Sequence, residues 1–286
     1  MKYAFVKEHS SQYRTSLLLS VLGASSSGYY TWLGREPSAR AQANRVLTEK
    51  IAAFHKASRE TYGSPRIHQD LVASGERVSV NRVARLMKRQ GIQSKVARKF
   101  IVTTDSRNTR APAPDRLQRA FRVERPNKAW VSDTTFIRTR QGWLYLAVVL
   151  ELYSRQVIGW SMGNKNSSQL VEDALTMALW RRGEPRDIVV HSDQGSTYAS
   201  GTYQRLLAQN ALICSMGRRG ECLDNAVAES FFGTLKNELV DHEDYRSRSE
   251  ARQSVFEYIE VFYNQRRRHS TLGYLSPAEY ERQNVS

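Results

Sequence analysis

The chain of 286 residues lacks the features of several protein classes. Its two cysteines, Cys214 and Cys222, form no CxxC pair and have no histidine at zinc-like spacing, so we expect no structural zinc and a reducing, cytoplasmic setting. No apolar run approaches the roughly 18 to 20 residues of a membrane span, and residues 17–19 are too short for the core of a signal peptide. We therefore expect a soluble protein with no membrane partner.

Acidic residues are scarce in the first part of the chain. Residues 1–120 hold 22 Lys and Arg against 8 Asp and Glu, whereas residues 121–286 hold 21 against 20. The first part thus carries +14 of the formal net charge of +15. This asymmetry indicates a polyanion-binding front end, most simply for nucleic acid, on a nearly neutral body. The alternative is a basic surface that is only well solvated.

Hydrophobic residues make up 40% of the chain, enough for a real core and, at this length, for about two domains. In the first segment, residues 1–40, we expect a small helical hairpin broken at Gly23, with serines placed to cap its second helix. Two interpretations of this segment stay open. It is either a helix-turn-helix remnant or a small aromatic docking hairpin.

Residues 41–95 predict a three-helix, helix-turn-helix-like DNA-binding module. Its helices are expected over about 41–57, from Ser64 and Pro65 to about Ala73, and over 80–90 after an N-cap at Ser79. The last helix places Val80, Val83, Ala84 and Met87 on one face and candidate DNA-binding residues on the others: Asn81, Arg82, Arg85, Lys88 and Arg89. Arg can bridge guanine and Asn adenine, while Lys and Arg hold phosphates. The alternative is a basic helix that contacts only the DNA backbone or solvent.

Residues 96–120 predict a basic linker, because hydrophobic periodicity is weak there while proline and positive charges recur. Arg98 and Lys99 are its candidate DNA contacts. Residues 121–240 predict an α/β core, in which a meander of three antiparallel strands is followed by alternating helix and strand. This order implies a mixed five-stranded sheet flanked by helices. The expected strands are 130–137, 143–152, 156–161, 187–191 and 211–215, and the expected helices are 167–182, 200–209 and 221–240.

Three Asp–Glu pairs in the chain stand 36 positions apart: Asp115 and Glu151, Asp193 and Glu229, and Asp224 and Glu260. The first pair begins in the linker, and the third has ordinary structural explanations at a helix start and on an amphipathic helix. Asp193 instead follows a buried strand, and Glu229 lies on a helix face opposite a buried stripe. With Asp133 in the middle of the first strand, a mixed sheet can bring these three carboxylates together. We expect His191, at the end of the fourth strand, to be a packed histidine.

Carboxylates suit divalent-metal phosphoryl transfer. Mg²⁺ and Mn²⁺ take oxygen ligands, and two such ions about 3.5 to 4 Å apart can activate an attacking oxygen and stabilise a leaving one at a phosphodiester. We therefore predict that Asp133, Asp193 and Glu229 are catalytic residues and ligands of two Mg²⁺ or Mn²⁺ ions. Asn225 is a predicted supporting residue, and Lys236, two turns after Glu229, is predicted to face DNA.

Five motifs follow one another along the core and the C-terminal segment. They are residues 130–135 (WVSDTT), 142–155 (GWLYLAVVLELYSR), 191–198 (HSDQGSTY), 224–238 (DNAVAESFFGTLKNE) and 263–273 (YNQRRRHSTLG). In this order they closely resemble the second-frame (OrfB-type) transposases of two-frame bacterial insertion sequences, and the resemblance covers almost the whole chain. It implies an integrase-type catalytic core with the RNase H fold, whose Asp, Asp, Glu triad falls on Asp133, Asp193 and Glu229 and whose basic residue falls on Lys236.

The resemblance also implies the partners of the protein. They are double-stranded DNA, in element terminal repeats and targets, and further copies of the chain, at least a dimer on DNA in the bacterial nucleoid. Frameshifting commonly joins an upstream DNA-binding, oligomerising frame to this one, and residues 1–60 contain no leucine-zipper heptad. We therefore expect an upstream-frame protein, or a fusion to it, as a further partner.

Residues 241–286 predict a C-terminal helix over about 249–265 and a basic tail. In that tail Arg266, Arg267 and Arg268 are either contacts to the DNA backbone or a solvated charge run. Two other functions of the whole chain stay open beside transposition. One is an RNase H-like nuclease acting on RNA–DNA hybrids, which explains the basic helical module poorly. The other is a non-catalytic DNA-binding regulator with an inert core.

Overall fold

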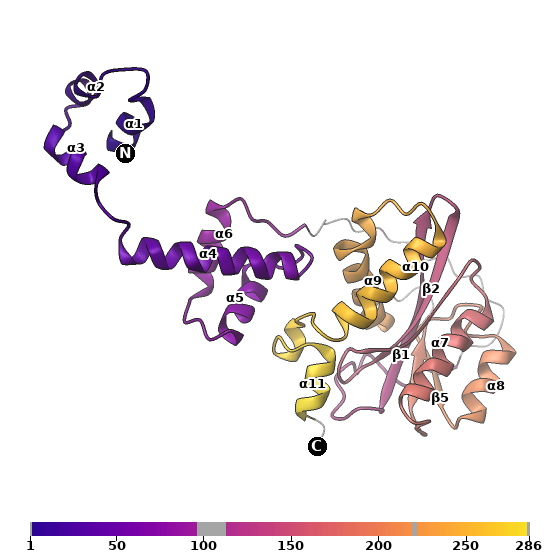
Figure 1. Ribbon diagram of the computed structural model, residues 1–286. Coiled ribbons are helices and arrows are strands. Elements are labelled where there is room, and N and C mark those ends of the chain that lie inside the picture. The colour runs from indigo at the N-terminus through magenta and orange to yellow at the C-terminus, as the bar shows by residue number, and fades with distance from the viewer. Residues whose placement is uncertain (1, 96–112, 219–221, 285–286) are drawn as a thin grey trace.

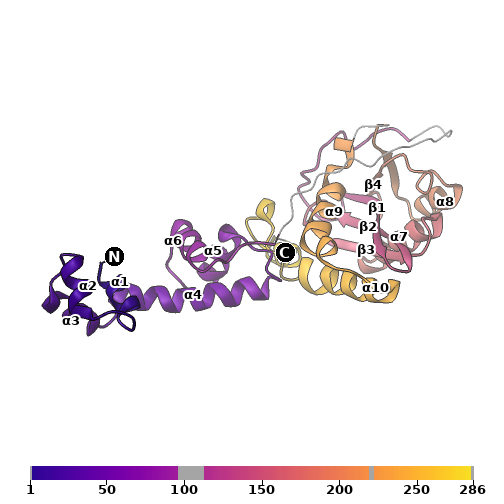
Figure 2. The ribbon, with the colours of Figure 1, turned by 90° about the horizontal axis from the view of Figure 1, so that it is seen from above.

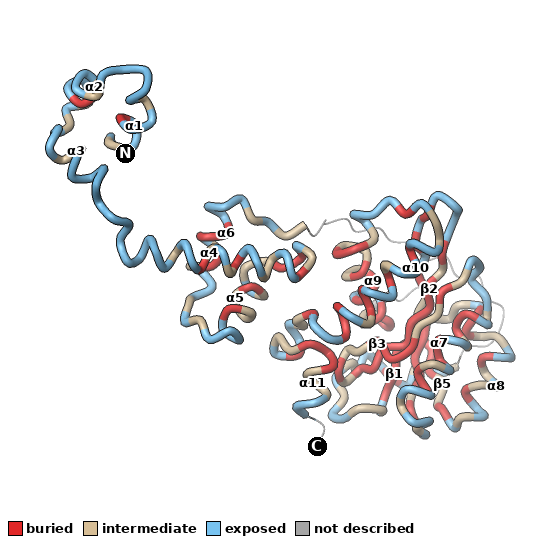
Figure 3. Tube along the Cα trace, viewed as in Figure 1, coloured by how far each residue is buried: buried red, intermediate tan, exposed pale blue. Residues whose placement is uncertain are grey.

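The computed structural model describes residues 2–95, 113–218 and 222–284. Figures 1 and 2 show a small N-terminal group of helices, a second helical group, and an α/β core covered by the C-terminal helices. In Figure 3 the buried residues concentrate in the core, whereas the N-terminal group is largely exposed. None of the helices in these described ranges is long and apolar enough to cross a membrane.

Three short helices form the N-terminal group: α1 (Lys2–His9), α2 (Thr15–Val21) and α3 (Ser26–Leu33). They pack around Val6, Leu19 and Tyr29. The predicted break at Gly23 has a φ of +56°, a conformation that favours glycine. Ser25 caps α3 as expected, because its hydroxyl accepts the Gly28 backbone N–H at 3.2 Å. Helix α1 was not predicted, since its residues show no apolar periodicity.

The second helical group consists of α4 (Ala39–Ala57), α5 (Ser64–Ala73) and α6 (Val80–Arg89). Its buried residues are Leu47, Ile51, Ile67, Leu71, Val83, Leu86 and Met87. Ser79 caps α6 as predicted, by accepting the Arg82 backbone N–H at 3.3 Å. Two details differ from the prediction. Gly63, not Ser64, is the N-cap of α5, and Val80 is 37% exposed because the packed face of α6 begins at Val83.

The core contains five strands: β1 (Ala129–Thr139), β2 (Gly142–Glu151), β3 (Val157–Gly163), β4 (Val189–Ser192) and β5 (Ile213–Met216). They form one sheet in the order β3-β2-β1-β4-β5. The first three strands are antiparallel neighbours, whereas β4 pairs in parallel with both β1 and β5. The predicted mixed five-stranded sheet is confirmed.

Helices cover both faces of the sheet, as Figure 2 shows. One layer contains α7 (Ser168–Arg181) and α8 (Gly201–Gln209), and the other contains α9 (Ala226–Glu238) and α10 (Arg248–Phe256). Ala147 and Val149 of β2 pack in the cluster that includes α7. Leu146 and Val148 pack in the cluster that includes α9. Alternate residues of one strand therefore belong to different layers, as the period of two requires.

The C-terminal segment packs on the core instead of forming a tail. Helix α10 continues into η3, a π-helix (Glu257–Tyr263), which is followed by η4 (Ser270–Leu272) and α11 (Pro277–Asn284). The Asn264 side chain extends the edge of β3: it accepts the Val157 backbone N–H at 3.0 Å and donates to the Val157 carbonyl at 2.9 Å. The expected division at residue 240 therefore does not separate two packing units.

The expected linker extends too far along the chain. Leu117 is buried in the core cluster, and the backbone N–H of Arg116 donates to the Ser215 hydroxyl at 2.9 Å. Asp115 accepts the backbone N–H groups of Leu117 and Gln118, at 3.1 and 2.9 Å. Because of these contacts, residues 113–120 lie against the core, and the prediction of an extended tether is wrong for them. Residues 96–112 lie outside the described residues.

Candidate active site

The pairing of β1 with β4 places two of the predicted acids side by side. The two strands run in parallel, and Val131 of β1 is aligned with His191 of β4. Two residues further along each chain, Asp133 and Asp193 reach the same level. Neighbouring strands lie about 4.8 Å apart, so the two carboxylates belong to adjacent positions across the end of β4.

The carboxylate of each aspartate has one hydrogen-bond partner within the described part of the chain, and it is a backbone N–H. Thr134 donates to Asp133 Oδ1 at 2.7 Å, and Gly195 donates to Asp193 Oδ1 at 2.9 Å. A Cβ on Gly195 would lie 2.8 Å from that Asp193 oxygen, so a larger residue there would push the carboxylate out of this position. The remaining carboxylate oxygens keep their acceptor capacity for another ligand.

The two carboxylates interact electrostatically. Burial, and then the neighbouring Asp193 carboxylate, hold the pKa of Asp133 well above its usual range; Glu229 adds to this shift, while the Thr134 N–H and Lys236 oppose it. Burial also raises the pKa of Asp193, against the hydrogen bond from Gly195. Negative charge is therefore costly at this position, and a bound cation would relieve that cost.

Helix α9 brings Glu229 toward this pair. Glu229 lies in its first turn and is exposed. Asn225, at the N-cap, donates from Nδ2 to the carbonyl of Ser132 at 3.4 Å, next to Asp133. Asn225, the predicted supporting residue, is buried, with only 5% of it exposed. Its hydrogen bond to Ser132 fixes the start of α9 on β1.

The predicted metal site is only partly assembled. Among residues 2–95, 113–218 and 222–284, no group of three or more His, Cys, Asp or Glu side chains is arranged to hold a metal ion. Asp133 and Asp193 are brought together, whereas Glu229 is linked to Asp133 by charge without completing a cluster. The two aspartates fit a divalent cation, because they offer free carboxylate oxygens in a place where negative charge is destabilised.

Lys236 lies two turns after Glu229, as expected. Its Nζ is 5.2 Å from the centre of the Phe136 ring, a cation–π contact, and its charge reaches Asp133. His191 is fully buried, and its Nδ1 is 2.9 Å from the Ser215 hydroxyl. Burial lowers the pKa of His191, so the prediction of a packed histidine is confirmed.

The other two Asp–Glu pairs have structural roles. Glu151 is buried and accepts the Asn127 backbone N–H at 2.9 Å and the Trp130 indole N–H at 3.0 Å. Asp224 is buried and is paired with Arg119 at 2.6 Å and with Arg218 at 3.2 Å. Hydrogen bonds from Arg218 lower the pKa of Asp224 despite its burial. Both acids are saturated by partners within the protein.

The candidate DNA-binding residues of α6 fall into two groups, one exposed and one held by a contact within the protein. Asn81, Arg85, Lys88 and Arg89 are exposed. Arg82 is held within the helical group, because its guanidinium donates to Asn44 Oδ1 at 2.8 and 3.1 Å. Arg98 and Lys99 lie outside the described residues.

The prediction that three consecutive arginines contact DNA or solvent is wrong for two of them. Arg266 is exposed. Arg267 is 4% exposed and forms a two-pronged pair with the Glu238 carboxylate, at 2.7 and 2.8 Å. Arg268 donates to Asp70 of α5 at 2.5 Å, and its backbone N–H donates to the Tyr62 hydroxyl at 2.6 Å. Arg267 therefore holds the C-terminal segment to α9, and Arg268 holds it to the second helical group.

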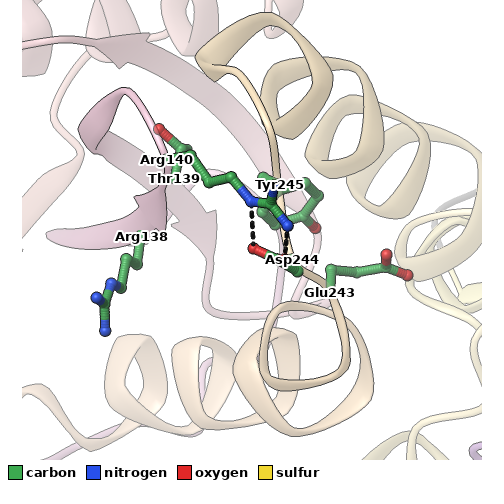
Figure 4. A pocket seen from close by; sticks show the side chains of 6 residues that line it. All are labelled: Arg138, Thr139, Arg140, Glu243, Asp244 and Tyr245. Carbon is green, nitrogen blue, oxygen red and sulfur yellow. Dashed lines mark hydrogen bonds and ion pairs between the residues drawn. The ribbon is translucent and has the colours of Figure 1, made fainter.

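A surface pocket of about 350 Å³ lies at the β1–β2 turn. Figure 4 shows its lining residues, with Arg140 paired to Asp244. Because Asp244 is neutralised by this arginine, we assign the pocket no catalytic role. The residues around it join the β1–β2 turn to the segment between α9 and α10. Arg140 pairs with Asp244 there, and its backbone N–H donates to the Tyr245 carbonyl at 2.9 Å.

Known families and proteins match the chain along its length. Two integrase core domain families match residues 123–222 and 229–285, and an HTH-like domain family matches residues 41–100. The transposase InsF of insertion sequence IS3A from Escherichia coli K12 is 41% identical over 288 residues, which cover 100% of both chains. The chain belongs to this family of insertion-sequence transposases. It is therefore an enzyme of the DDE transposase class, a polynucleotidyl transferase, and its mixed sheet is an RNase H-like integrase core.

Two further proteins from other sources are similar to this transposase. The uncharacterized 31 kDa protein of insertion element IS600 from Shigella sonnei is 42% identical over 263 residues, covering 92% of this chain and 97% of that protein. The HTLV-2 integrase catalytic core domain, solved in complex with magnesium, is 19% identical with a TM-score of 0.41, and covers 54% of this chain and 96% of that one.

Three further residues of the transposase core were not among the candidates that the sequence suggested. Phe136 and Trp143 are 42% and 46% exposed on the β1–β2 hairpin. The sequence signal for their exposure was their place in strands where polar residues alternate with apolar ones. Tyr198 is buried beside Ser132, with 3.1 Å between their hydroxyl oxygens. No local pattern marked that contact, because it joins residues 66 positions apart.

Proposed function

We propose that the chain catalyses divalent-metal-dependent cleavage and strand transfer of DNA at the ends of its element, with Asp133, Asp193 and Glu229 as the catalytic acids. The observation that carries this proposal is the pair of neighbouring carboxylates of Asp133 and Asp193, each of which has one backbone N–H as its hydrogen-bond partner within the described residues. The full-length relative named as a transposase supports the class of reaction.

Two Mg²⁺ or Mn²⁺ ions would polarise the phosphodiester and neutralise charge that develops on it. Asp133 and Asp193 would hold them from neighbouring strands, and Glu229 would do so from α9. Oxygen ligands suit these ions, and cation binding would remove the repulsion that raises the pKa of Asp133. In the reaction, water or a DNA 3′-hydroxyl forms a new bond to phosphorus as the bond to the leaving 3′-oxygen breaks. The attacking group gives its proton to solvent, and the leaving oxygen takes up a proton from solvent to become a 3′-hydroxyl.

DNA is held outside the acidic site by basic residues. Lys236 is close enough to interact with Asp133, and it would contact a phosphate next to the reacting one. The exposed residues of α6, together with Arg98, Lys99 and Arg266, would neutralise phosphates further along the duplex. The active species in this proposal is an oligomer of at least two copies on DNA, formed by this chain or by its fusion to the upstream-frame protein.

The test is cleavage and joining of a duplex that carries an element end, with Mg²⁺ or Mn²⁺. We expect Asp193→Asn to reduce both reactions below detection, because the amide cannot bind a cation as the carboxylate does. The matched control is Asp173→Asn, since Asp173 is an exposed aspartate on α7, and this variant should keep wild-type activity. Activity that survives Asp193→Asn would contradict the assignment of that residue.

The same assay distinguishes the other two functions. Faster cleavage of an RNA–DNA hybrid than of the element-end duplex would favour an RNase H-like nuclease. A wild-type protein that neither binds Mn²⁺ nor gains thermal stability from it, relative to Asp133→Ala, would favour a DNA-binding regulator without catalysis.

A further inference from the structure

Two aromatic rings lie together on the surface of the β1–β2 hairpin. The centres of the Phe136 and Trp143 rings are 4.9 Å apart at an interplanar angle of 77°, and the side chains are 42% and 46% exposed. Trp180, at the end of α7, is more exposed at 80%, but no other aromatic ring of the described residues contacts it. The hairpin pair is thus a continuous aromatic surface that the fold leaves in solvent.

Positive charge surrounds this aromatic pair. Lys236 Nζ lies 5.2 Å from the centre of the Phe136 ring. Arg138 is directly across from Trp143 in the β1–β2 pairing and is exposed. Arg248 donates from Nε to the Trp143 carbonyl at 3.0 Å, which keeps a third cation at the hairpin. Aromatic rings between cations are the combination that binds single-stranded nucleic acid, because bases stack on the rings while phosphates meet the charges.

The hairpin is held firmly in place. The Thr139 hydroxyl donates to the Gly142 carbonyl at 2.6 Å across the turn. The Arg248 backbone N–H donates to the Gln141 side chain at 3.2 Å, and Arg140 is paired with Asp244 (Figure 4). A surface already fixed before binding loses little conformational entropy when a base stacks on it.

The aromatic pair lies on the same strand pair as Asp133, with Phe136 nearer to that acid than Trp143, which is aligned with Arg138, five residues after Asp133. Phe136 follows Asp133 by three residues on β1, a span of about 10 Å. Their side chains point to opposite faces of the sheet, yet Lys236 interacts with both. They can meet at the edge of β1, because β4 pairs only with Ala129, Trp130 and Val131. Beyond Val131, no described strand covers this edge.

We propose that Phe136 and Trp143 form a stacking platform for an unpaired base a few nucleotides from the reacting phosphate. This inference rests on the proposed function and deepens it: the substrate would be a DNA end whose terminal nucleotides are separated from their complement. The ring of Trp143 stacks on the base, Phe136 supports Trp143, and Lys236 and Arg138 contact the flanking phosphates. The occupant is nucleic acid because all three cations at the platform favour an anionic chain.

The test measures binding without catalysis, in EDTA, with full-length protein carrying Asp193→Asn. The probe is an element-end duplex with a short single-stranded overhang that contains the fluorescent base 2-aminopurine. We expect binding to quench the fluorescence of the unpaired base. Adding Trp143→Ala should abolish the quenching and weaken affinity by roughly 10- to 100-fold, the range expected for one stacked base. Trp143→Phe should retain most of both effects.

Two controls separate stacking from other causes. Trp180→Ala, at an exposed tryptophan away from the hairpin, should leave quenching and affinity unchanged. A blunt duplex should bind the Trp143→Ala protein as tightly as the parent protein. Unchanged quenching in Trp143→Ala, or equal weakening on blunt and overhang DNA, would overturn the proposal. If Trp143→Ala fails to fold, as judged by circular dichroism, Phe136→Leu serves the same comparison.

The outcome is independent of the catalytic assignment. If Asp193→Asn proves active in the cleavage assay while stacking is lost with Trp143→Ala, the proposed acids are wrong and the platform stands. If cleavage requires Asp193 but stacking does not require Trp143, the platform is wrong and the proposed function stands.

Discussion

The two ends of helix α9 carry the same residue type in opposite states. Glu229, in the first turn, is exposed and makes no hydrogen bond or ion pair with any residue that the structure describes. Glu238, in the last turn, is 3% exposed and has four short contacts. It accepts two hydrogen bonds from Arg267, at 2.7 and 2.8 Å, one from the Tyr258 hydroxyl at 2.8 Å and one from Arg66 at 3.4 Å.

This difference separates acids that hold the fold from acids that are available to a ligand. A buried carboxylate is tolerated when ion pairs or hydrogen bonds compensate its charge, as they do for Glu238, Asp224 and Glu151. Among the described residues, Asp133 and Asp193 have one backbone hydrogen bond each and Glu229 has none, although burial raises the pKa of all three. Unpaired acids with raised pKa values, gathered at one sheet edge, are typical of functional sites.

The largest effect should come from changing the unpaired glutamate. Glu229→Gln keeps the size of the side chain and removes its charge, so we expect DNA cleavage to fall below detection. The free energy of unfolding should change by less than about 0.5 kcal/mol, as is usual for an exposed position. Cleavage assays and urea unfolding measure the two quantities. Glu257→Gln, at an exposed glutamate of η3, is the control and should cleave like the wild type. Wild-type cleavage by Glu229→Gln would show that Glu229 is not a catalytic acid.

A large loss of stability should come from the paired end. Arg267→Ala leaves Glu238 buried with a charge that only Arg66 opposes, and removing one partner of a buried pair costs about 3–5 kcal/mol. The neighbouring Arg266 is exposed, so Arg266→Ala should change the free energy of unfolding by less than about 0.5 kcal/mol. Urea unfolding of the two variants gives the comparison. Equal midpoints would mean that the Glu238 pair contributes nothing to folding.

The smallest effect concerns pH at the paired end. Burial, and then the charge of Arg267, lower the pKa of His269 to about 3, whereas histidine in an unfolded chain titrates near 6.5. The unfolded chain therefore takes up the proton first as pH falls. The contribution of neutral His269 to stability is complete above about pH 6.5 and is lost progressively as pH falls toward the folded value.

We expect this loss to be on the order of 1 kcal/mol between pH 7 and pH 5. His269→Gln cannot titrate, so its unfolding free energy should fall less over this interval than that of the wild type. His242→Gln, at an exposed histidine, should follow the wild type. Parallel pH profiles for wild type and His269→Gln would show that His269 is not held neutral by its surroundings.

Periodicity and turn residues predicted most elements of this fold within a few residues. The five strands, the break at Gly23 and the Ser79 cap depend on neighbours in sequence, and local patterns report them well. Helix α1 was missed, and two other segments that were predicted less well depend on distant contacts. Residues 113–120 are held by Ser215 and by burial of Leu117, and the C-terminal segment is held by the bond of Asn264 to Val157.

By itself, the sequence determined the basic front end, the order of strands and helices, and which acids stand at a strand exit or on an open helix face. Only the tertiary structure decided which charges remain free. Arg267 and Arg268 belong to the same basic run as exposed Arg266, yet they are paired with Glu238 and Asp70. Pairing depends on which groups meet after burial, and desolvation makes each meeting either a strong ion pair or a costly lone charge. Spacing along the chain carries no information about those meetings.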